Sequence, residues 1–135
     1  MRERLVNLAS EVGLPIDPPQ RNVNSRFALE TAELVRELRG DAASGAFHHD
    51  VSQAFFAERA DISKPAVIVP LAERHGVAAA ETEAAWSERR YATKVDGFIE
   101  AAHLAGVTGV PAFAWPNRRA IAGMMPPDVL IQRLR

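Results

Sequence analysis

The sequence predicts a predominantly helical α+β domain. Apolar residues recur at helical spacing over most of the first 105 residues. A glycine-rich corner at residues 106–111 precedes an apolar stretch, and a proline turn at residues 115–118 leads into a second one. With 135 residues, of which 47% are hydrophobic, the chain is long enough to bury one core, so a single domain over residues 1–135 is expected.

The first helix is expected over residues 2–12. Its apolar residues fall at i, i+3, i+4 and i+7: Leu5, Leu8, Ala9 and Val12. Gly13 is suited to end this helix, because glycine adopts the left-handed conformation that often follows a last helical turn. Residues 14–23 contain three prolines and are predicted to form an extended connector.

Two further helices are expected in the next segment. Asn24 or Ser25 is a candidate cap for the first of them, and Gly40 is expected to end it. A loop over residues 41–45 is then predicted to lead into the next helix. The inner face of the first helix is expected to consist of Phe27, Thr31, Leu34 and Leu38, with Val35 beside it, and that of the second of Phe47, Val51, Ala54 and Phe55.

Residues 66–75 are ambiguous from the sequence alone. Ser63-Lys64-Pro65 is typical of a helix start, with proline in the first turn. However, Val67, Ile68 and Val69 are β-branched and suit a short buried strand, while Pro70 would interrupt a helix at a cost of about 3 kcal/mol. Propensity therefore leaves both helix and strand open here.

The rest of the chain is expected to form two helices, a hairpin and a final helix. Residues 78–91 alternate alanine with charged residues, and the next helix is expected to begin at Thr93 and to end at Gly106. Strands are predicted at 112–115 and 119–122, joined by a turn with proline and asparagine at its centre. Pro126, Pro127 and Asp128 are expected to start the last helix. The aromatic residues Trp86, Phe98, Phe113 and Trp115 are all predicted to lie in the core.

Composition and spacing exclude several kinds of chemistry. The chain has no cysteine, so it has no disulfide, thiolate metal site or thiol redox chemistry of its own. A net charge of −1 gives no general attraction to nucleic acid or to an anionic membrane, and no run of residues is apolar enough to span a bilayer. The four histidines lack the spacing of a zinc site, and no metal or catalytic residue is predicted. The charged N-terminus lacks the apolar run of a signal peptide, so a cytoplasmic location is expected.

The stretch Gly106-Val107-Thr108-Gly109-Val110-Pro111-Ala112-Phe113 carries a family resemblance. It resembles the cis-proline loop of DsbA-like thioredoxin-fold proteins, especially their FrnE-like branch. Asn24-Ser25-Arg26-Phe27-Ala28 is similar to a helix start of that branch, and Phe47-His48 and Asp61-Ile62 resemble its helical insertion. The resemblance covers nearly the whole chain and implies that residues 66–75 are helical.

The resemblance implies a specific architecture and a candidate site. The expected fold is a truncated thioredoxin-like fold, with a DsbA-type helical insertion over residues 1–105 and the loop, hairpin and final helix over residues 106–135. The N-terminal segment that carries Cys-x-x-Cys in the family has no counterpart here. Gly109, Val110 and Pro111 are implied to present main-chain groups to a peptide or a thiol ligand, with Val110–Pro111 cis. Asn24 and Phe47 are possible supporting residues.

Three functions are open at this point. The chain is expected to be a relative of protein disulfide oxidoreductases that is inactive alone, because it lacks cysteine, with no cofactor. The first alternative is kinship to the glutathione-dependent 2-hydroxychromene-2-carboxylate isomerases, for which glutathione would be the ligand. The second is a non-catalytic dimerising module. A two-stranded hairpin is marginal without further cover, so its edge strand is expected to pair with a second copy of the chain.

Overall fold

The computed structural model describes residues 2–17 and 22–134 of the chain. The chain divides into two compact units, here called the helical unit (residues 1–93) and the hairpin unit (residues 94–135). In chain order the elements are α1 (Arg2–Glu11), α2 (Arg26–Arg39), α3 (Asp41–Phe56), α4 (Pro65–Arg74), α5 (Ala79–Ser87), α6 (Ala92–Leu104), β1 (Ala112–Phe113), β2 (Ile121–Ala122) and α7 (Pro127–Leu134).

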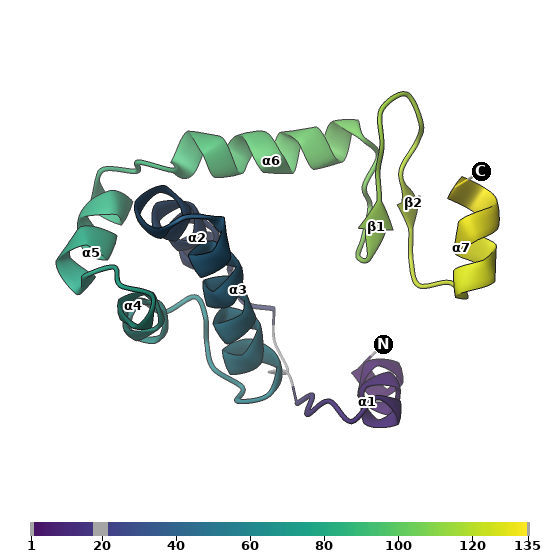
Figure 1. Cartoon of the computed structure of the whole chain (residues 1–135), viewed down its shortest axis with the longest axis horizontal. Helices are drawn as coiled ribbons and strands as arrows, with labels where there is room; N and C mark the ends of the chain where they lie inside the picture. The colour runs from purple at the N-terminus through teal and green to yellow at the C-terminus, as the bar shows by residue number, and fades with distance from the viewer. Residues whose placement is uncertain (1, 18–21, 135) are drawn as a thin grey trace. The chain divides into compact units, whose positions relative to one another are not determined.

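Helix α2 is the centre of the helical unit. It packs against α3, α4 and α5, and α4 also contacts α3 and α5 (Figure 1). Leu34 and Val35 of α2, Phe47 of α3 and Ile68 of α4 are fully buried in one hydrophobic core. The i, i+3, i+4 spacing of the apolar residues places them on the helix faces that meet there. Burial of this shared face stabilises helices that are too short to persist alone.

A polar link fastens α5 to α2 beside this core. Trp86 of α5 donates from its indole Nε1 to the hydroxyl of Thr31 at 3.0 Å, and Thr31 donates to the carbonyl of Phe27 at 2.6 Å. The rings of Phe27 and Trp86 lie 4.4 Å apart between centroids. Since Thr31 is completely buried, its hydroxyl needs hydrogen-bond partners within the protein, and these two bonds supply them. Trp86 thus packs against the core, as the sequence predicted.

The predicted loop over residues 41–45 is wrong, because α3 already begins at Asp41. The small side chains at its start allow α2 and α3 to approach closely. Ser44 is completely buried, and its hydroxyl donates to the carbonyl of Ala32 in α2 at 2.9 Å. Gly45 lies within the helix, and a Cβ added there would meet no atom within 4 Å. Packing between helices therefore outweighs the low helix propensity of serine and glycine.

Residues 66–75 form a helix, which settles the ambiguity of the sequence. Helix α4 starts at Pro65, where a missing N–H costs nothing, and includes Pro70. Pro70 is exposed, whereas Ile68, Leu71 and Ala72 are buried. Pro70 has no N–H, so the carbonyl of Ala66, four residues earlier, lacks its usual donor within the helix. Ala66 is exposed, so water can hydrogen-bond to this carbonyl instead.

The next two helices differ slightly from their predicted bounds. The stretch predicted as helical over residues 78–91 is shorter, since α5 ends at Ser87. Arg89 adopts a positive φ of 52° after it, which redirects the chain. Helix α6 begins at Ala92, so Thr93 lies inside its first turn and is not its cap.

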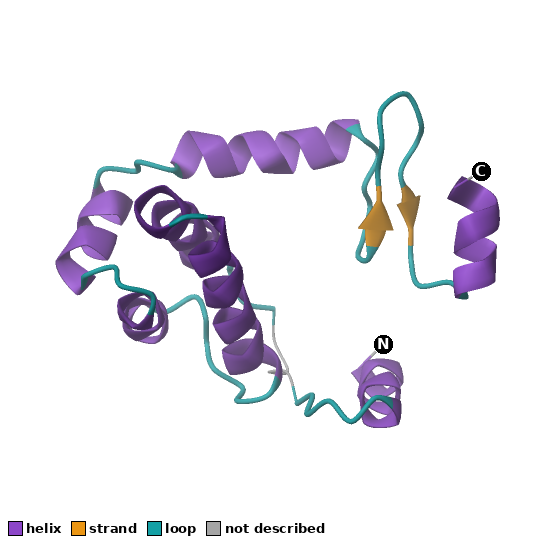
Figure 2. Cartoon of the chain, viewed as in Figure 1, coloured by secondary structure: helices purple, strands orange, loops and turns teal. Residues whose placement is uncertain are grey.

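The hairpin unit contains a small antiparallel sheet (Figure 2). Ala112 lies opposite Ala122, and Phe113 lies opposite Ile121. Both strands have only two residues, shorter than the predicted 112–115 and 119–122. Asn117, with a φ of 65°, occupies the turn between them. Helix α7 follows, beginning with the predicted Pro127 and Asp128.

The hairpin unit leaves large apolar side chains exposed. Phe98 of α6 is 54% exposed and Phe113 of β1 is 36% exposed, so the prediction that both lie in the core is wrong. Trp115 is half-buried, and α7 has no buried residue. The apolar pattern correctly identified the apolar faces of these elements. Within the described part of this unit, however, no other helix or strand covers those faces.

Among the described residues, helices dominate and a single two-stranded sheet lies between α6 and α7, so the predicted helix-dominated α+β class is confirmed. The predicted boundary between residues 105 and 106 stays a prediction. Part of the predicted connector, residues 18–21, lies outside the described residues. In the described ranges, no helix is both long and apolar enough to cross a bilayer.

Candidate functional site

The predicted site lies in the loop between α6 and β1. Helix α6 is followed by Gly106 with a φ of 76°, a left-handed conformation that glycine adopts without strain. The N–H of Ala120, just before β2, donates to the carbonyl of Ala105 at 3.1 Å. This bond ties the hairpin to the end of α6 and so fixes the base of the loop.

Val110 is almost fully exposed to solvent in this loop. It is 91% exposed, and Gly109 and Pro111 beside it are also exposed. The Val110–Pro111 peptide bond is cis. Across the described residues, the main-chain N–H and C=O of Val110 form no hydrogen bond, whereas the carbonyl of Pro111 accepts one from Gly123 at 2.8 Å. The loop therefore offers one donor and one acceptor directly before β1.

The surroundings of Val110 in the sequence are uncharged. Residues 107–116 contain no acidic or basic side chain, and their only polar side chain is Thr108. A ligand at this loop would be held by main-chain hydrogen bonds and apolar contacts. The loop has no side chain that could act as a general acid or a general base, and none that is a strong nucleophile.

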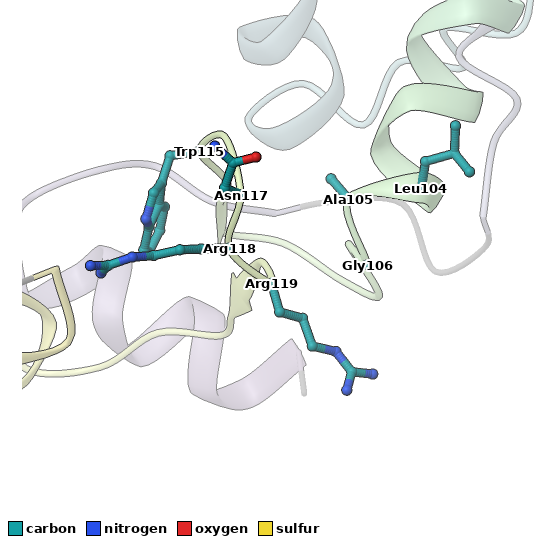
Figure 3. A pocket seen from close by; sticks show the side chains of 7 residues that line it. All are labelled: Leu104, Ala105, Gly106, Trp115, Asn117, Arg118 and Arg119. Atoms are coloured by element: carbon teal, nitrogen blue, oxygen red, sulfur yellow. The ribbon is translucent and has the colours of Figure 1, made fainter.

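A shallow open hollow of about 720 Å³ lies elsewhere in the hairpin unit, between the end of α6 and the hairpin turn (Figure 3). Arg118 lies over the ring of Trp115, with its Cζ 5.9 Å from the ring centroid. The side chain of Arg119 points away from this pair and runs beside Gly106. The two guanidinium groups do not converge on one point, so the hollow does not form an anion site.

Sequence reasoning missed this hollow. The sequence contained a signal for it. Trp115 and Arg118 lie on either side of a proline turn, a spacing that brings a cation and an aromatic ring together. The structure adds a packing role for both arginines.

The two residues predicted to support the site lie in the helical unit. The Asn24 side-chain oxygen accepts the N–H of Arg26 at 2.9 Å, at the start of α2, while Ser25 makes no side-chain cap bond. Phe47 is completely buried and packs edge-on against His75. Both residues thus have structural roles, and their support of the loop stays a prediction.

The remaining polar clusters of the helical unit are structural. His75 follows α4 and bonds to Asp50 at 2.9 Å. Arg90 pairs with Glu81 at 2.5 Å and Glu88 at 2.8 Å, as expected for a solvated surface. Within residues 2–17 and 22–134, no three acidic or histidine side chains gather as metal ligands would.

Comparison with known proteins is consistent with this geometry. No curated protein matches the chain. A family model described as a DSBA-like thioredoxin domain matches residues 1–135, which is the whole chain. A mostly helical chain that ends in a proline loop, a hairpin and a helix agrees with the resemblance seen in the sequence. The chain belongs to the family of DSBA-like thioredoxin domains.

Proposed function

We propose that this chain is a redox-inactive DsbA-like protein that binds extended polypeptide segments at the loop formed by Gly109, Val110 and Pro111. The observation that carries the proposal is the exposure of Val110, 91%, together with its main-chain N–H and C=O, which have no partner among the described residues. An extended peptide pairs with a neighbouring backbone through such groups. Without cysteine, the chain cannot exchange a disulfide with what it binds.

The chemistry of the loop indicates the class of peptide. Because residues 107–116 carry no charge, binding depends on main-chain bonds and apolar contacts and not on the charge of the peptide. The bound segment is therefore apolar, as exposed in unfolded or partly folded proteins. If the chain is FrnE-like and cytoplasmic, as we propose, its loop would meet such segments on newly synthesised polypeptides.

We also propose that two copies of the chain associate through the edge of the hairpin. Phe113 of β1 is partly exposed, and β1 pairs with β2 on one side. An edge strand with free main-chain groups is a template for another strand. Pairing with a second copy would cover apolar surface that the hairpin unit leaves in water.

Peptide binding is tested with a permanently unfolded probe, fluorescently labelled α-lactalbumin that has been reduced and capped with carboxamidomethyl groups. Its anisotropy should rise when the full chain is added, and the affinity should change less than about twofold between about 0.05 M and about 0.5 M NaCl, because no ion pairs form. Binding that weakens steeply with salt would mean that the arginines, and not the loop, hold the probe.

A substitution at Gly109 locates the binding. A Cβ added at Gly109 meets nothing within 4 Å, and its φ is not positive, so a side chain fits there without disturbing the fold. Gly109→Leu should fill the space beside Val110 and weaken binding at least tenfold. Gly45→Leu, in an equally open position on α3, is the matched control. Equal affinities for the two variants would rule out the loop as the site.

Two activity measurements separate the alternatives. In an insulin-reduction assay the chain should give no turnover above the uncatalysed rate. Isothermal titration with glutathione should give no heat of binding, and saturable binding that Gly109→Leu abolishes would favour the isomerase-like alternative.

A further inference from the structure

The hydrogen bonding of β1 determines which of its main-chain groups face outward. Gly123 donates to the carbonyl of Pro111, so these two residues form a hydrogen-bonded pair of the antiparallel ladder. Pairs of this kind alternate with non-hydrogen-bonded pairs along a strand. The main-chain groups of Phe113 and the carbonyl of Pro111 therefore face β2, and the N–H and C=O of Ala112 point to the opposite edge. By the same alternation, the N–H and C=O of Ala114, the residue directly after β1, are expected on that edge as well.

The apolar surface of the hairpin unit is large enough for a stable dimer. Eight large apolar residues of this unit are exposed by 36% or more: Phe98, Ile99, Leu104, Val110, Phe113, Met124, Ile131 and Leu134. With a full area of roughly 200 Å² for a large apolar side chain, their exposed fractions correspond to on the order of 900 Å² in contact with water. One partner of a standard protein interface contributes about this area.

We infer that two copies of the chain pair through β1 in an antiparallel register with Phe113 on the two-fold axis. This inference rests on the self-association proposed above and specifies its geometry. In this register Ala112 of each copy lies opposite Ala114 of the other, and each such pair exchanges two main-chain hydrogen bonds. The two β1 strands then join their hairpins into one four-stranded antiparallel sheet.

Three features favour this register over its neighbours. Centring on Phe113 brings two aromatic rings together in a non-hydrogen-bonded pair, where side chains approach most closely. A shift that centres on Ala114 would oppose Ala112 to Pro116, which has no N–H to donate. A shift that centres on Ala112 would oppose Val110 to Ala114 and place the main chain of Val110, which the proposed peptide binding needs, in two hydrogen bonds of the dimer.

The absence of cysteine makes this register testable by cross-linking. Opposed residues of a non-hydrogen-bonded pair have Cα atoms about 4.5 Å apart, within the range that a disulfide spans. Under a mild oxidant, Phe113→Cys should form a covalent dimer at least ten times faster than Asn117→Cys, an exposed control at the hairpin turn. Ala112→Cys alone should match the control, because its two copies would be too far apart in this register.

A second pair of variants retains the Phe113 ring. A mixture of Ala112→Cys and Ala114→Cys chains should cross-link as a heterodimer, faster than either chain alone. Sedimentation of the unmodified chain at micromolar concentration provides the reference and should show a dimer.

Each outcome has a distinct meaning. A strict monomer would refute both the register and the proposed self-association, while leaving peptide binding to its own assay. A dimer in which Ala112→Cys cross-links with itself would refute only the register. A dimer that cross-links at none of these positions would place the interface on another face.

Discussion

Removing the Thr31 hydroxyl tests the link that fastens α5 to the core. Thr31→Val keeps the shape of the side chain but leaves the indole N–H of Trp86 without its acceptor, at present 3.0 Å away. An unsatisfied buried donor costs about 1–3 kcal/mol. Because Trp86 is only half-buried and water reaches part of it, the lower part of this range applies, and we expect a loss of about 1–2 kcal/mol in the free energy of unfolding.

Thr82→Val is the matched control for this change. Thr82 is equally buried, but its hydroxyl only donates to the carbonyl of Ala78, the residue that precedes its own helix, at 3.3 Å. Denaturation in urea, followed by circular dichroism at 222 nm, should show a clearly smaller loss for Thr82→Val. A cycle with Trp86→Phe should give a coupling energy with Thr31 of at least about 0.5 kcal/mol. Equal losses at Thr31 and Thr82 would refute the proposed role of the hydroxyl.

Two further predictions concern the helical unit. Gly40→Ala should destabilise the chain by about 1–3 kcal/mol, because the φ of 88° and ψ of 175° at Gly40 lie in a region that only glycine adopts without strain. Gly45→Ala, at an open position within α3, is the control, and equal urea midpoints for the two variants would contradict this. Burial, together with a hydrogen bond to Glu37, raises the pKa of Tyr91 to about 12. Since the unfolded tyrosine ionises near pH 10, stability should fall as the pH rises from about 10 to about 12, and Tyr91→Phe should remove this part of the fall in a pH series of thermal melts.

The helical unit could largely be predicted from the sequence. The spacing of apolar residues identified most of the buried faces of α2 and α3, although the predicted Leu38 is 42% exposed, and Pro65 marked the start of α4. Propensity failed at α3, where Ser44 is buried against Ala32 and the first turn depends on packing between helices. Such a contact between distant residues leaves no local signal in the chain.

For the hairpin unit, the order of the elements along the chain could be predicted, but the exposure of their side chains could not. The corner at Gly109, the turn at Asn117 and the start of α7 follow from glycine and proline chemistry. The exposure of Phe98 and Phe113 does not, because an apolar pattern shows which face avoids water and not what covers it. The candidate site was located by resemblance, and its exposed main-chain groups became visible only in the structure.

Binding of extended polypeptide at the loop of Gly109, Val110 and Pro111 is tested most directly by amide NMR. The ¹⁵N-labelled chain is titrated with the carboxamidomethylated α-lactalbumin. If the loop binds extended polypeptide through its main chain, the amide signal of Val110 should shift, with the largest changes in residues 107–114. Shifts confined to residues 22–93, or an unchanged Val110 amide at saturation, would contradict binding at this loop.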